Sequence, residues 1–158
     1  MTKSPKSKAE VSQTTIDWGK TSEDYASYRY GQPNSFYKKL YPLGIGIKNQ
    51  TVLDLGTGTG LIARNLAERG CNVSGIDIST KQINIAKTLS LADSLDIDFR
   101  VGKAEMLPFE NSSFDCVTSS NSWQYFHQNR TILEVKRILK PDGLLMISHF
   151  SWLPKLSQ

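Results

Sequence analysis

The sequence predicts an α/β protein, a three-layer α-β-α sandwich around a doubly wound, mostly parallel β-sheet. Two observations carry this prediction. Helical and strand-like hydrophobic patterns alternate along the chain with few interruptions. A short apolar run also leads directly into a cluster of glycines that opens a helix, over residues 52–69. Strands separated by helices pair in parallel through right-handed crossovers, which places helices on both faces of the sheet.

Two short helices are predicted before the first strand. Ser22 can cap a helix over residues 24–28. Asn34 can cap a second helix that carries residues 36–40, and the Pro-Leu-Gly sequence at 42–44 ends it. The strand signals begin only after these segments.

Five strands then alternate with three longer helices. Gly70 ends the first of these helices, because glycine suits the position after a helix C-terminus. Ser79 and Gln82 form a capping box that opens the second helix, and Asn129 caps the third. A turn at residues 141–143 precedes the last strand. The predicted strands are Thr51–Leu55, Val73–Asp77, Ile97–Val101, Phe114–Ser120 and Leu144–His149.

Length and composition indicate one soluble domain. The chain has 158 residues, of which 39% are hydrophobic and 22% charged. We expect a flexible basic tail over residues 1–14 and a single core over residues 15–158. The tail contributes to the net charge of +4, but its spaced lysines form too weak a patch to predict a nucleic-acid partner.

The cysteines and the hydropathy pattern indicate the cellular compartment of the protein and whether it binds a metal. Cys71 and Cys116 follow no metal-ligand spacing, and no cluster of histidines, cysteines and carboxylates suggests a metal. We interpret them as reduced core thiols. No stretch approaches the roughly 20 apolar residues of a membrane span, and residues 1–10 lack the apolar centre of a signal peptide. The prediction is a cytoplasmic protein without a metal or a membrane span.

The glycine turn after the first predicted strand indicates a nucleotide-cofactor site. Glycines let backbone N–H groups approach a ligand, and the following helix points its N-terminus at that ligand. A dinucleotide fingerprint requires G-x-G-x-x-G, but Leu61 stands at its third glycine position. The glycines instead alternate, at Gly56, Gly58 and Gly60, and Asp54 precedes them at the strand end.

Asp77 is the second element of this predicted site. It ends the second predicted strand, about 20 residues past the glycine turn, where an open α/β sheet presents groups to its ligand crevice. A carboxylate there can accept hydrogen bonds from both ribose hydroxyls. NAD and other ribose-containing cofactors suit it equally, and a helix-capping or solvent-facing aspartate is the alternative interpretation.

Three blocks of this sequence resemble class I methyltransferases, which use S-adenosyl-L-methionine (SAM). The blocks are VLDLGTGTG at 52–60, GKAEMLPF with SFD at 102–115, and LEVKRILKPDGLLMI at 133–147. Upstream, YASYR at 25–29 resembles the element that covers the cofactor in this group. The resemblance runs from residue 25 to about residue 153 and points to the small-molecule type.

The resemblance implies SAM as cofactor and S-adenosyl-L-homocysteine (SAH) as product. Lys103 stands where the family often has an acidic residue for the adenine amino group, so adenine recognition is expected from Ala104 and Glu105. Arg29 can hold the methionine carboxylate by a bidentate pair, and Tyr25 can pack near the methyl group. The cofactor-binding residues implied are Tyr25, Arg29, Asp54, Gly56, Thr57, Gly58, Gly60, Asp77, Ile78, Gln82, Ala104, Glu105 and Asn121.

The expected activity is methyl transfer to a small-molecule acceptor. The acceptor attacks the sulfonium methyl in line, and the protein aligns the reactants and excludes water. The catalytic residue is unknown; His127 is a candidate base, with a surface or capping histidine as the alternative. Trp123, Tyr125 and Phe126 can line a pocket for an aromatic or lipophilic acceptor.

Two other functions are weighed against this one. A truncated SAM-binding core without turnover, as a fragment or a regulatory module, shares every residue named so far. A nicotinamide-dependent oxidoreductase is disfavoured by Leu61 and by the block at residues 104–109.

The C-terminal end departs from the family. Methyltransferases of this class normally continue past the fifth strand into a sixth and a seventh strand, whereas this sequence stops eight residues after Phe150. We therefore expect those two strands to be missing and the fifth strand to form an edge. Because exposed edges invite pairing with another chain, a homodimer through this edge is a further expectation.

Overall fold

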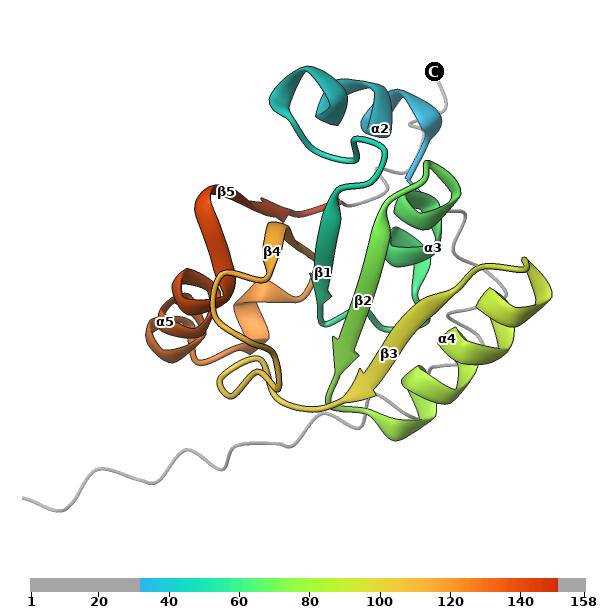
Figure 1. Cartoon of the computed structure of the whole chain (residues 1–158). Coiled ribbons are helices and arrows are strands. Elements are labelled where there is room, and N and C mark those ends of the chain that lie inside the picture. The colour runs from blue at the N-terminus through green and yellow to red at the C-terminus, as the bar shows by residue number, and fades with distance from the viewer. Residues whose placement is uncertain (1–31, 151–158) are drawn as a thin grey trace, which may run out of the picture.

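The computed structural model describes residues 32–150, in which a single five-stranded sheet is flanked by helices (Figure 1). The strand order is β3-β2-β1-β4-β5, and every neighbouring pair is parallel. The predicted helix at 24–28, with Tyr25 and Arg29, and the predicted tail at 1–14 lie outside the described residues.

The elements follow the alternation expected from the sequence. The strands are β1 Thr51–Leu55, β2 Asn72–Asp77, β3 Ile97–Val101, β4 Phe114–Ser120 and β5 Leu139–Ser148. The α-helices are α2 Asn34–Leu40, α3 Leu61–Glu68, α4 Thr80–Ala92 and α5 Gln128–Ile138. Two 3-10 turns, η1 Tyr41–Leu43 and η2 Trp123–Tyr125, complete the described chain.

Two hydrophobic cores, one on each face of the sheet, confirm the three-layer architecture. Successive side chains of a strand point to opposite faces. On β1, Val52 belongs to the core shared with α2, α3 and α4, whereas Leu53 and Leu55 belong to the core shared with α5. The chain reverses its strand order between β1 and β4, and an open α/β sheet binds ligands at such a switch point.

Strand β2 begins one residue earlier than predicted and β5 ends one residue earlier. Three further predicted boundaries were wrong, each because of a contact with a distant segment or a neighbouring proline. Asn34 is the first residue of α2, and Pro33 occupies the N-cap position. His127, two residues before Asn129, is the N-cap of α5. The fifth strand begins at Leu139, five residues earlier than predicted, because Leu139 pairs with β4.

The predicted turn at residues 141–143 is a bulge inside β5. Leu139 pairs with Phe114, and the next aligned pair is Leu144 with Cys116, so residues 140–143 leave the regular ladder. Asp142 there has a φ of 64°, in the left-handed region.

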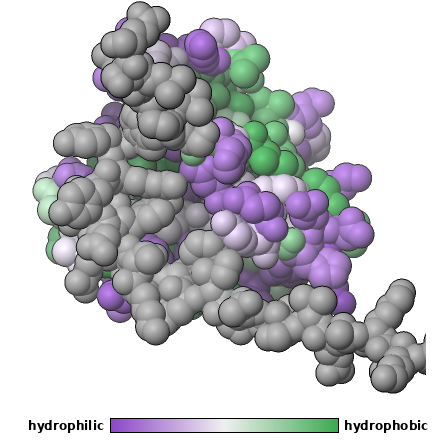
Figure 2. Space-filling view, turned by 180° about the vertical axis from the view of Figure 1, so that it is seen from behind, coloured by the Kyte–Doolittle hydropathy of each residue, from purple (hydrophilic) through white to green (hydrophobic). Residues whose placement is uncertain are grey.

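Strand β5 is an edge of the described sheet, as expected. Exposed apolar side chains lie on it and on η1, among them Leu43, Leu144 and Ile147. Figure 2 shows hydrophobic side chains gathered on the side of the molecule that carries these two elements. Within residues 32–150 no strand lies beyond β5.

Cys71 and Cys116 are free thiols in the core, as predicted. Burial raises the pKa of Cys71 to about 11 and that of Cys116 to about 12. In the described part of the chain no helix has the length and apolar character needed to cross a bilayer, and no group of three potential metal ligands is found.

Candidate cofactor site

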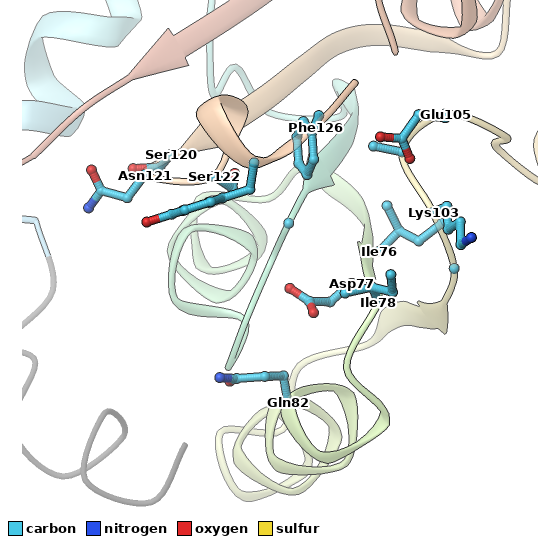
Figure 3. Close-up of a pocket in the computed structure, with 14 residues that line it drawn as sticks. Ile76, Asp77, Ile78, Gln82, Lys103, Glu105, Ser120, Asn121, Ser122 and Phe126 are labelled. Carbon is cyan, nitrogen blue, oxygen red and sulfur yellow. The ribbon is translucent and has the colours of Figure 1, made fainter. Parts of the chain in front are cut away.

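A pocket of about 250 Å³ opens at the carboxyl ends of the central strands (Figure 3). Its walls come from the segments that follow β1, β2, β3 and β4. Seven of the lining residues were implied by the sequence, namely Gly56, Asp77, Ile78, Gln82, Ala104, Glu105 and Asn121. The others are Ile76, Gly102, Lys103, Ser120, Ser122, Tyr125 and Phe126.

The glycine turn is held by hydrogen bonds within the chain. The Thr57 amide donates to the Ile76 carbonyl at 3.0 Å, and the Gly60 amide donates to the Thr57 carbonyl at 2.9 Å. The Gly58 amide donates to Asp77 Oδ2, also at 2.9 Å. The Thr57 and Gly58 amides therefore fix the turn against β2, and the Gly60 amide closes the turn on itself. All three bind groups of the chain instead of facing a ligand, which corrects the expectation for them.

Gly56 contributes space to the pocket. Its φ is +64°, and a Cβ at this position would lie 2.5 Å from Ser122 Cβ and 3.1 Å from Phe126 Cζ. The Ser122 hydroxyl donates to the Leu55 carbonyl at 2.9 Å, which ties the segment after β4 to the end of β1. A side chain at residue 56 would thus displace the wall formed by Ser122 and Phe126.

Asp77 is the charged group at the centre of the site. Its Oδ2 accepts from the Gly58 amide and its Oδ1 from the Ser79 amide, each at 2.9 Å. Figure 3 shows the carboxylate directed into the pocket from the end of β2. Burial raises its pKa, while these amide hydrogen bonds oppose the rise. A carboxylate has about four acceptor positions, so the two amides leave room for a diol.

Asp54 lies beneath the glycine turn and is not among the residues that line the pocket. It is 2% exposed, and its Oδ1 accepts a hydrogen bond from Thr118 Oγ1 at 2.7 Å. Burial raises the pKa of Asp54 to about 6. Thr57, Gly58 and Gly60 likewise shape the turn from outside the lining.

The segment after β3 forms one wall. Gly102, Lys103, Ala104 and Glu105 line the pocket, and Ala104 is buried. The Glu105 carboxylate accepts from the His127 amide at 2.7 Å, so it joins this wall to the N-terminus of α5. In Figure 3 the Lys103 amine points away from Asp77.

Apolar and aromatic side chains line the remaining walls. Ile78 is 60% exposed at the pocket mouth, where an apolar face is available to a flat ring. Tyr125 and Phe126 reach the pocket, as the sequence suggested. Trp123 instead packs edge-on against Phe126, with ring centroids 6.0 Å apart, in the core beneath.

Two predicted residues have other contacts. Asn121 lines the pocket, but its side chain bonds the Phe150 backbone, with Oδ1 accepting at 2.7 Å and Nδ2 donating at 3.1 Å. His127 is exposed and absent from the lining, and its carbonyl accepts the Arg130 and Thr131 amides of α5. Its position matches the capping alternative.

Sequence reasoning missed Ile76, Gly102, Ser120 and Ser122 as site residues. Gly102 has a clear physical role, since a Cβ there would lie 2.7 Å from Ile76 Cδ1. Its place at the end of the β3 pattern was the available signal. Ser122 gave none, because its partner, the Leu55 carbonyl, lies 67 residues away in the sequence.

A family model described as methyltransferase domain matches residues 53–147, more than half of the chain. This chain belongs to the methyltransferase domain family. The matched range contains the glycine turn, Asp77, the wall after β3 and helix α5. The recognised family and the observed architecture therefore agree.

Curated relatives of this methyltransferase domain include two quinone-pathway enzymes by name. Ubiquinone biosynthesis O-methyltransferase of Dechloromonas aromatica is 30% identical over 141 residues, covering 82% of this chain and 61% of the relative. Demethylmenaquinone methyltransferase of Thermotoga maritima is 36% identical over 121 residues, covering 75% of this chain and 51% of the relative. The chain thus spans only part of the length of the relatives it matches.

A solved structure supports the fold. A Methanococcus maripaludis protein, provisionally assigned as an S-adenosyl-L-methionine-dependent methyltransferase, superposes with a TM-score of 0.71 at 21% identity. The match covers 89% of this chain and 68% of that protein. At this identity the likeness establishes the shared Rossmann-like α/β architecture.

Proposed function

We propose that this chain binds SAM in the pocket and transfers its methyl group to a small-molecule acceptor. The observation that carries the proposal is the Asp77 carboxylate, which two backbone amides fix at 2.9 Å while it faces the cavity. A carboxylate held in this way is suited to bind the two hydroxyls of a ribose. The family membership supports the same cofactor.

The lining residues fit the parts of SAM. Ile78 and Phe126 offer apolar surface for a purine, and Ala104 and Glu105 provide a backbone edge for its hydrogen bonds. SAM supplies an already activated methyl group, so the chain has to orient the reactants and exclude water. Tyr25 and Arg29 stay proposed contacts for the methionine end.

We propose an aromatic acceptor of the quinone class. The names of the two relatives, which refer to ubiquinone biosynthesis and to demethylmenaquinone, support this choice. Tyr125 and Phe126 supply aromatic surface at the pocket, and Tyr125 is 53% exposed, so it can meet a second ligand. His127 stays a candidate base that activity measurements have to test.

A calorimetric titration with SAM, SAH and NAD tests the cofactor. We expect micromolar binding of SAM and SAH and none of NAD. Transfer of a labelled methyl group from SAM to demethylmenaquinone and to a catechol-type quinone precursor then tests the acceptor. Binding of NAD in place of SAH would overturn the proposal, and SAH binding without transfer to any acceptor would favour the non-catalytic core.

We further propose a cytoplasmic homodimer that pairs through the β5 edge. The free thiols of Cys71 and Cys116 support a reducing compartment, and exposed Leu144 and Ile147 support pairing at β5. Sedimentation velocity over a range of concentrations tests the dimer. A monomer at every concentration would overturn it.

A further inference from the structure

The pocket wall after β3 has no secondary structure of its own. Residues 102–113 run from β3 to β4 and pass beside α5 (Figure 1). The first four of them line the pocket. A segment without a helical or sheet ladder keeps a fixed shape only when other groups bind its backbone, so its hydrogen-bond partners determine the shape of the wall.

Arg137 of α5 supplies several of those partners. Its guanidinium donates to the Leu107 carbonyl at 2.9 Å, to the Phe109 carbonyl at 2.7 Å and to Asn111 Oδ1 at 3.0 Å. A planar guanidinium with five donors can serve these acceptors together, and a lysine cannot. One side chain therefore holds three residues of the segment.

Glu134 completes the arrangement. Its carboxylate binds Arg137 in a bidentate pair, with Nε to Oε1 at 2.9 Å and Nη2 to Oε2 at 2.8 Å. Oε2 also accepts from the Leu107 amide at 2.7 Å. Both backbone groups of Leu107 are thus bound to this pair, and Leu107 itself is buried.

A second attachment lies closer to the pocket. Glu105 binds the His127 amide at the start of α5, whereas Leu107 is bound near the end of the same helix. Ala104 and Glu105 are therefore held between α5 and the end of β3. The wall and α5 form one connected unit.

We propose that the Glu134–Arg137 pair positions the wall at residues 102–105 and thereby determines which purine the site accepts. This inference rests on the proposed function, since it concerns the base of the bound nucleoside. Adenine presents an acceptor at N1 and a donor at its 6-amino group, and hypoxanthine presents the reverse at both places. A backbone edge held in one position matches only one of these patterns.

The test compares SAH with its 6-oxo analogue, S-inosyl-L-homocysteine, by calorimetry. We expect the wild-type chain to prefer SAH by at least about 30-fold, and Arg137→Lys to reduce that ratio at least about 5-fold. Arg130→Lys is the matched control, because Arg130 is an exposed arginine of the same helix. It is expected to leave the ratio unchanged.

The ratio separates positioning from general loss of structure. Partial unfolding lowers the apparent affinity for both ligands by the same factor, so it leaves the ratio of the two affinities unaltered. If Arg137→Lys does not fold, Glu134→Gln takes its place, because it removes the carboxylate charge at nearly constant shape. It is expected to reduce the preference for SAH in the same way. An unaltered ratio in the folded variants would overturn this inference alone. A wild-type chain that binds neither ligand would overturn the proposed function and this inference together.

Discussion

The Gly58 amide and the Asp77 carboxylate are joined by a hydrogen bond of 2.9 Å, which links the glycine turn after β1 to the end of β2. The same carboxylate faces the pocket. Asp77 therefore has two roles, as an internal partner of the turn and as the proposed ribose acceptor. Variants at this position have to be evaluated for both.

Replacing Asp77 by asparagine is expected to weaken SAH binding about 100-fold. The variant loses the charge and one of the acceptor oxygens, and hydrogen bonds to charged groups contribute about 1.5–3 kcal/mol each. Titration calorimetry measures the effect. Asp93→Asn is the control, because Asp93 is an exposed aspartate paired with Arg64. Unchanged SAH affinity in Asp77→Asn would overturn the proposed contact between Asp77 and the ribose.

Two glycine variants separate backbone strain from steric overlap. Gly56 and Gly58 both have positive φ, of +64° and +56°, so alanine at either position costs about 1–2 kcal/mol. A Cβ at residue 56 would also lie 2.5 Å from Ser122 Cβ, whereas the nearest atom at residue 58 is 3.9 Å away. Urea unfolding should therefore show a larger loss of stability for Gly56→Ala. Equal losses would mean that Ser122 moves aside freely.

Stability should rise as the pH falls from 7.5 to 5 because of Asp54, and Asp77, whose pKa burial also raises, contributes with the same sign. The pKa of Asp54 is about 6 in the folded chain and 3.8 as a free group. The fold thus favours the protonated form, and this contribution is lost as the pH rises through about 6. The full difference corresponds to about 3 kcal/mol in the free energy of unfolding and is reached only below about pH 4, so about half of it develops between pH 7.5 and pH 5. Urea unfolding of the wild type and of Asp54→Asn at both pH values measures the contribution of Asp54 to this pH dependence.

Asp115 provides a control of opposite sign. Hydrogen bonds from Lys140 Nζ and the Thr51 amide, both at 2.8 Å, lower its pKa. Its contribution is present at neutral pH and is lost only as the pH falls below about 4. Asp115→Asn should therefore leave the change between pH 7.5 and pH 5 as it is in the wild type. A pH response of undiminished size in Asp54→Asn would show that Asp54 does not cause it.

The two buried thiols should react only when the chain opens. Burial raises the pKa of Cys71 to about 11 and that of Cys116 to about 12, so at pH 8 the thiolate is scarce and shielded. A disulfide reagent that releases a coloured thiol measures the rate. We expect the native rate to be at least about 100-fold below that in urea. A fast native reaction would show that the core around β1 and β4 is accessible.

Much of the fold could be predicted from local patterns. Strands β1, β3 and β4 have the predicted bounds, because each is a short run with clear turn signals on both sides. The start of α5 was missed because its N-cap amide binds Glu105, a residue of another segment. The start of β5 was missed because the pairing of Leu139 with Phe114 continues across a bulge. Neither contact leaves a local signal.

The site residues divide in the same way, into those with a local sequence signal and those defined by contacts with distant segments. The glycine turn and Asp77 were readable because their residue types and spacing are specific to nucleotide binding. The sequence could not show that the turn's amides bind β2, since those bonds depend on strand register. The roles of Glu134 and Arg137 were equally hidden, because their partners are backbone groups some 27 to 30 residues away.

Helix α5 ends at Ile138 and β5 begins at Leu139, with no residue between them. One residue inserted between Arg137 and Leu139 would rotate the preceding turns of α5 by about 100° relative to β5 and would withdraw Arg137 from Leu107. The same insertion at residues 140–143 would fall in the bulge, where the ladder is already interrupted. Natural length variation in this family should therefore be tolerated in the bulge and excluded from the helix, only a few positions away.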